Sequence, residues 1–83
     1  MKPRQQAQTY LQKRITAILP TLMDQVTQEE NGMFLFSHPI FPELRVEGIT
    51  IGFVQEHVER ALKRQFKNQS DKHIDYLFNL LSK

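Results

Sequence analysis

The chain has 83 residues, 40% of them apolar and 24% charged, which is typical of one globular domain over 1–83 rather than of a disordered segment. It has no cysteine, which excludes disulfides and thiolate metal sites, and its longest apolar run is four residues, far below the ~20 that span a bilayer. The net charge of +2 is too mild and too spread out to indicate nucleic-acid binding by itself.

The first predicted element is an amphipathic helix over residues 4–29, because apolar residues recur there at spacings of three and four. This stripe consists of Ala7, Leu11, Ile15, Ile18, Leu22 and Val26. Pro20 interrupts the helix, since proline removes one helical hydrogen bond and crowds the preceding turn. It either kinks a single helix or begins a second one. The stripe keeps its phase across Pro20, which favours the kinked helix, and Asn31-Gly32 is interpreted as its end.

The middle of the chain predicts a short two-stranded antiparallel ribbon. Residues 33–36 are all apolar, two of them phenylalanine, and form a run of strand length. Residues 44–46 alternate apolar and polar as a half-buried strand does. The intervening stretch SHPIFPE contains two prolines, which stiffen the connection and keep the residues before them extended.

Two helices are predicted to follow. Thr50 can cap a helix over 51–67, and Ser70 can cap a last helix with Asp71 in its first turn. The expected inner residues are Ile51, Val54, Val58, Ala61, Leu62 and Phe66 in the first, and Ile74, Leu77, Phe78 and Leu81 in the second. The fold class is therefore α+β: a kinked N-terminal helix, a two-stranded ribbon and two C-terminal helices. An all-α bundle of three or four helices is the alternative.

We do not expect an enzyme, a cofactor or a metal site. The chain has three histidines, and the segment EHVER at 56–60 has one histidine where a zinc-binding H-E-x-x-H helix needs two. No nucleophile elbow, phosphate loop or dinucleotide fingerprint occurs.

The apolar segment 33–44 is the candidate binding surface. In a strand, Met33 and Leu35 point to one face while Phe34 and Phe36 point to the other, so both faces of the ribbon are apolar. Three helices with short connections are expected to cover only one of these faces. The exposed remainder would be a protein interface. The residues predicted to bind a partner are Phe34, Phe36, Ile40 and Phe41. A closed monomer that encloses both faces is the competing interpretation.

A basic helix face offers a second candidate. Four cations of the 51–67 helix recur at helical spacing and project from one side, as in a helix that lies against phosphates. With two cations of the first helix, the nucleic-acid set is Arg60, Lys63, Arg64, Lys67, Lys13 and Arg14. The competing interpretation is a solvated face with stabilising pairs Glu56–Arg60 and Glu59–Lys63.

Together, these observations predict a small, non-enzymatic regulatory or adaptor protein of the cytoplasm. It would bind protein partners through the segment 33–44, with a second copy of itself as the favoured partner and no membrane contact. The alternative function is a small dimeric nucleic-acid-binding regulator that uses the basic face.

Overall fold

The computed structural model describes residues 3–82, with side chains from Tyr10 onward, so the predicted stripe residue Ala7 lies outside the described side chains. The elements are α1 (Pro3–Met23), β1 (Thr27–Gln28), β2 (Phe34–Phe36), β3 (Val46–Gly48), α2 (Ile51–Phe66) and α3 (Asp71–Leu81). The strands form one antiparallel sheet in the order β1-β2-β3. The predicted α+β class is confirmed.

The first helix ends at Met23, six residues earlier than predicted. It is one continuous helix through Pro20, which lies in its last turn and accepts a hydrogen bond from the Asp24 amide through its carbonyl. The next two amides, of Gln25 and Val26, bond three residues back instead of four, and this tighter turn closes the helix.

Thr27 and Gln28, which the prediction places in the first helix, form a strand instead, so the sheet has three strands rather than two. Glu29 and Met33 close a hairpin through a main-chain hydrogen bond of 2.7 Å, and Gly32 between them has a φ of 86°. Three-residue hairpin loops often place glycine in this left-handed conformation. Asn31-Gly32 is therefore the turn between β1 and β2, not the end of a helix.

Both later helices begin as predicted. The Thr50 hydroxyl accepts a hydrogen bond from the Phe53 amide at 3.0 Å, and the Ser70 hydroxyl accepts one from the His73 amide at 3.2 Å. Each bond satisfies an amide that has no partner within its own helix.

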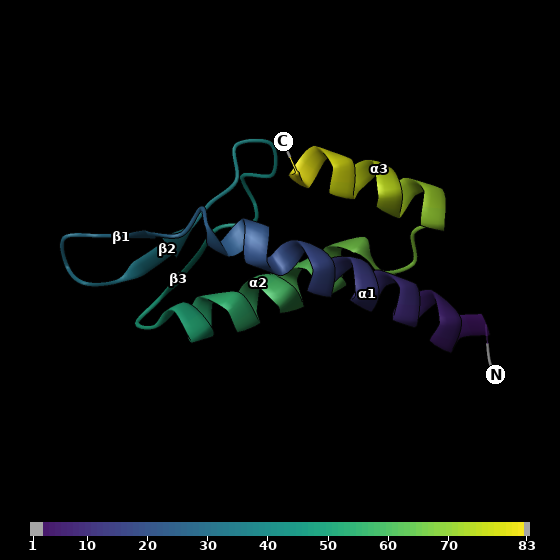
Figure 1. Ribbon diagram of the computed structural model, residues 1–83, viewed down its shortest axis with the longest axis horizontal. Coiled ribbons are helices and arrows are strands. Elements are labelled where there is room, and N and C mark those ends of the chain that lie inside the picture. The colour runs from purple at the N-terminus through teal and green to yellow at the C-terminus, as the bar shows by residue number, and fades with distance from the viewer. Residues whose placement is uncertain (1–2, 83) are drawn as a thin grey trace.

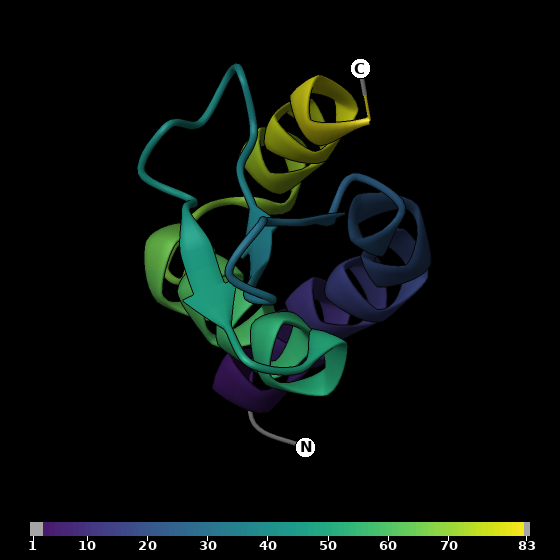
Figure 2. The ribbon, with the colours of Figure 1, turned by 90° about the vertical axis from the view of Figure 1, so that its left-hand side faces the viewer.

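The three helices enclose one core, and the sheet closes one end of it (Figures 1 and 2). α1 packs against α2 and α3, and α2 packs against β2 and β3. The molecule is elongated, 47 × 23 × 18 Å, with the sheet at one end of the long axis and the N-terminal part of α1 at the other (Figure 1). The buried core residues are Leu11, Ile15, Ile18, Leu19, Leu22, Phe36, Leu44, Val54, Val58, Ala61, Leu62, Phe66, Ile74, Phe78 and Leu81.

Candidate protein-interaction surface

The four residues predicted to bind a partner do not share one exposed surface. Phe36 is completely buried, so its predicted exposure is wrong: the protein's own helices cover the core face of the sheet. Phe34 and Phe41 are half-buried and pack against the core. Ile40 is 43% exposed and is the one member of the set with a largely open side chain.

The loop between β2 and β3 folds inward because His38 anchors it. The imidazole is 3% exposed, and its Nδ1 accepts a hydrogen bond from the Ile40 amide at 3.2 Å. Its Nε2 therefore carries the proton and donates to the Leu81 carbonyl at 3.0 Å. Phe41 follows the same loop inward, where its ring meets that of Phe66 edge-on with 6.1 Å between centroids. The buried imidazole of His38 and the packed ring of Phe41 therefore keep most of the segment 33–44 inside the molecule.

A different apolar surface is exposed where β3 turns into α2. It consists of Ile49, Ile51 and Phe53, which are 72%, 47% and 43% exposed, and we call it the turn patch. The remaining predicted inner residues of α2 are buried, but Ile51 stands at the first position of the helix, beyond the end of the core. Its predicted burial is wrong for that reason.

The turn patch has a defined shape because Gly48 and His57 hold the Phe53 ring. A Cβ on Gly48 would lie 2.3 Å from Cδ1 of Phe53 and 3.1 Å from its Cγ and Cε1, so the edge of the ring occupies the space that a side chain at position 48 would need. The face of the ring stacks on the His57 imidazole at 4.0 Å between centroids and 22° between planes. The imidazole is fixed in turn by Nδ1, which lies 3.0 Å from the Phe53 carbonyl. The exposed aromatic is thus preorganised.

The outer face of the sheet carries two neighbouring carboxyl groups. Thr27, Leu35 and Glu47 lie in one row across the three strands, and Glu29 follows two residues after Thr27 on the same face. Hydrogen bonding with the Glu47 carboxyl raises the pKa of Glu29 above its usual value. Loss of water contact and the charge of Glu47 add to the rise, and Arg45 opposes it.

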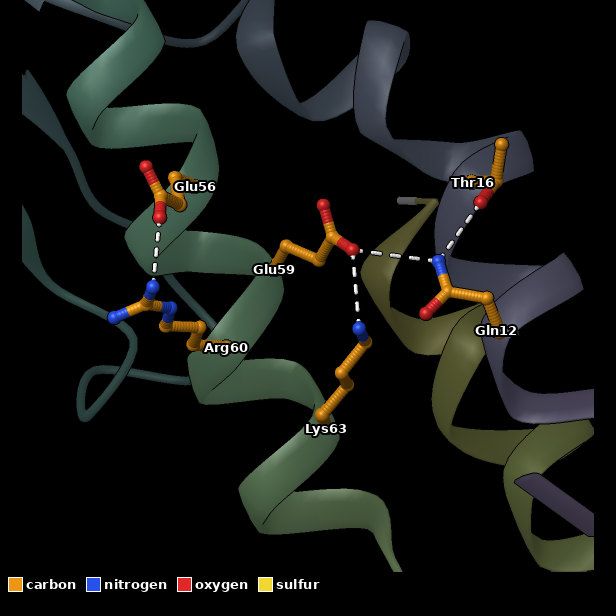
Figure 3. Close-up of polar contacts among 6 residues, drawn as sticks. All are labelled: Gln12, Thr16, Glu56, Glu59, Arg60 and Lys63. Carbon is orange, nitrogen blue, oxygen red and sulfur yellow. Dashed lines mark hydrogen bonds and ion pairs between the residues drawn. The ribbon is translucent and has the colours of Figure 1, made fainter. Parts of the chain in front are cut away.

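The basic face of α2 forms the ion pairs expected of a solvated face (Figure 3). Arg60 pairs with Glu56 at 2.7 Å, and Lys63 pairs with Glu59 at 3.2 Å. Glu59 also accepts a hydrogen bond of 3.3 Å from the Gln12 amide group, which joins α2 to α1 (Figure 3). Two of the four α2 cations proposed to bind phosphate are therefore matched by carboxylates of the same helix.

The remaining cations of the predicted nucleic-acid set differ in their contacts. Arg64, Lys67 and Lys13 are exposed. Arg14 pairs with Asp75 at 3.7 Å and lies 5.3 Å from the centroid of the Phe78 ring, so it joins α1 to α3. The nucleic-acid alternative stays a prediction, and these contacts assign structural roles to part of its residue set.

Residues 3–82 also bear on metal binding, cavities and membrane crossing. No group of three or more His, Asp or Glu side chains comes together there as metal ligands would. A shallow hollow at the hairpin is lined by Gln28, Glu29, Glu30 and Asn31, and it is open to solvent. No helix in this part of the chain combines the length and the apolar character that crossing a membrane requires.

Comparison of the chain with protein-family models, with curated proteins and with solved structures finds no match. The function proposed for the chain therefore depends on the geometry of the molecule itself.

Proposed function

We propose that this chain is a small, non-catalytic adaptor or regulatory protein that binds a protein partner through the turn patch. The carrying observation is the exposure of three large apolar side chains within the five residues 49–53. Their burial would contribute about 1.5–3 kcal/mol for each side chain fully removed from water. Contiguous exposed apolar surface of this kind marks interaction sites in soluble proteins.

The fixed Phe53 ring supports the proposal. Aromatic residues anchor many protein interfaces, and a side chain already held in its bound position loses little conformational entropy on binding. Phe53 meets this requirement because the edge of its ring fits against Gly48 and the face of the ring stacks on His57.

Ile40 is a second exposed apolar residue and retains part of the predicted role of the segment 33–44. The loop between β2 and β3, which contains it, lies beside the C-terminal end of α3, whereas the turn from β3 to α2 lies at the opposite end of the strands (Figure 1). A second copy of the chain remains one possible partner. The lack of cysteine fits a reducing compartment, and we include a cytoplasmic location in the proposal on that basis.

Site-specific photo-crosslinking in the native host tests the proposal. A benzoylphenylalanine replaces Ile49 in one version of the chain and Tyr76 in another, because Tyr76 is also exposed, at 59%, but lies on α3. We expect a crosslinked species of defined mass from position 49 and none of that mass from position 76. A species of twice the chain mass would identify a second copy as the partner.

Absence of any crosslink from position 49 would overturn the proposal, and so would the same species from both positions. Circular dichroism of each labelled chain shows whether the fold is preserved. Because Ile49 is largely exposed and precedes the helix, the substitution leaves the core unchanged.

A further inference from the structure

Charge is strongly segregated along this chain. Between residues 24 and 59 there are seven acidic residues and a single basic one, Arg45. The flanking segments 1–23 and 60–83 hold the other ten basic residues and only two acidic ones, Asp71 and Asp75. The mild net charge of +2 therefore conceals two regions of opposite sign.

Folding converts this segregation along the chain into segregation in space. The sheet and the first half of α2 lie at one end of the long axis (Figure 1). The N-terminal part of α1, the last turns of α2 and the start of α3 lie toward the other end (Figure 1). The sheet end is consequently acidic and the opposite end basic. Fields of one sign over a surface of this kind attract partners of the opposite charge.

The turn patch lies within the acidic end. Ile49 follows Glu47 by two residues, at the point where β3 leaves the sheet. In the register of the sheet Gly48 pairs with Phe34, and Phe34 with Gln28, so the acidic hairpin residues Glu29 and Glu30 lie beyond this same end of the strands. Ile49 therefore lies on the same face of the sheet as Glu29 and Glu47. The Phe53 ring lies against Gly48 on the opposite face, at the same end of the strand.

We propose that the turn patch binds a cationic amphipathic segment of another protein, in which apolar side chains cover Ile49, Ile51 and Phe53 while Lys or Arg side chains meet Glu29 and Glu47. This inference rests on the function proposed above and adds the chemistry of the partner. The register of the sheet places Glu29 and Glu47 on the same outer face, so an incoming cation can interact with both.

Two other kinds of partner fit this surface less well. Nucleic acids and anionic membranes carry negative charge, which the carboxylates of the sheet end repel. A second copy could present only its basic end, and such head-to-tail contact does not close on itself but continues into open chains. A different protein with a basic, apolar segment satisfies both the charge and the patch.

Titration of the full chain with designed peptides tests the inference. The probe is a synthetic peptide of about 15 residues, four helical turns, with leucines along one face and lysines along the other. Two matched peptides replace all lysines by glutamate or all leucines by serine. We expect saturable one-to-one binding of the Lys/Leu peptide by calorimetry, with at least about tenfold weaker binding of either control.

Variants of the chain locate the binding. Ile49→Ser with Ile51→Ser should weaken binding of the Lys/Leu peptide about tenfold or more, because both removed side chains would be buried in the complex. Glu29→Gln with Glu47→Gln should weaken it about two- to tenfold and flatten its dependence on salt concentration. Tyr76→Ser, an equally exposed change outside the patch, should leave it unchanged.

Equal binding of the Glu/Leu peptide would overturn the inference, as would Lys/Leu binding that survives the Ile49/Ile51 substitutions or an absence of binding. These failures are distinct from failure of the proposed function. A crosslink from position 49 without peptide binding would mean that the patch binds a protein of different chemistry. Crosslinking to a second copy alone would assign the patch to self-association and also overturn the inference.

Discussion

The imidazole of His38 joins the β2–β3 loop to the C-terminal end of α3 by donating a hydrogen bond to the Leu81 carbonyl, 43 residues away in the sequence. Because its other nitrogen accepts from the Ile40 amide, the ring satisfies two main-chain groups at once. This buried link explains why a loop that contains two prolines and several apolar residues does not extend into solvent.

Replacing His38 by alanine should lower the free energy of unfolding by about 2–4 kcal/mol, because it removes both hydrogen bonds and leaves a small void. Asparagine can still accept from the Ile40 amide, and glutamine can still donate to the Leu81 carbonyl. Each should therefore lose less stability than alanine. Urea denaturation of the three variants measures this order, and an alanine variant as stable as wild type would contradict the role of the link.

Glu29→Gln should stabilise the protein at neutral pH and have no such effect in acid. The raised pKa of Glu29 means that the folded state binds its proton more tightly than the unfolded state does. The favourable contribution of this proton is present below the usual pKa of 4.5 and is lost as pH rises through the raised value. Thermal unfolding of wild type and variant between acidic and neutral pH measures the difference.

Glu30→Gln is the matched control for this prediction, since it changes the same charge at the neighbouring position of the hairpin. A gain of stability at neutral pH equal to that of Glu29→Gln would attribute the effect to net charge rather than to the contact with Glu47.

Tyr10→Phe should weaken the attachment of α3 to α1, because the Tyr10 hydroxyl donates a hydrogen bond to Asp75. This bond, with burial and the Asp75 charge, raises the pKa of Tyr10 above its usual value of 10.0. The stabilisation is complete below that pH and is lost as pH rises from 10.0 through the raised pKa. The difference in stability between wild type and Tyr10→Phe should therefore shrink in alkali, as denaturation curves on both sides of this range would show.

Gly48→Ala should displace the Phe53 ring, because the added methyl group would lie 2.3 Å from Cδ1 of that ring. We expect a loss of about 1–3 kcal/mol in stability, as for other overpacked sites. Adding Phe53→Ala to Gly48→Ala should recover part of this loss, since it removes the clash. A double-mutant cycle measures the coupling, and strictly additive effects would show that the two residues do not interact.

Much of the helical structure could be predicted from the sequence because its signals are local. The apolar stripe of α2, its Thr50 cap and the Ser70 cap of α3 each depend on residues within one or two turns of one another. The structure follows both caps and the stripe from Val54 onward.

The end of α1 and the strand β1 could not be predicted in this way. Thr27 and Gln28 are both exposed and polar, and they form a strand only because β2 lies beside them. Asn31-Gly32 fits a hairpin turn as well as a helix end, so the local pattern could not separate the two.

The burial of part of the predicted surface could not be predicted from the sequence for a similar reason. Burial of Phe36 depends on the helices that cover it, and the inward course of the next loop depends on the contact between His38 and Leu81. A signal for the turn patch was present in the large apolar residues at 49, 51 and 53, whose alternate spacing does not fit one face of a helix.

The position of α1 between the other two helices has a consequence for how the molecule opens. α3 packs mainly against α1, whereas α2 packs against both α1 and the sheet. Amide hydrogen exchange should therefore reveal α3 as a separate cooperative unit that opens before the rest. Each such opening would transiently expose Phe78 and Leu81 to water. Warming should therefore produce partly unfolded, aggregation-prone molecules below the temperature of global unfolding.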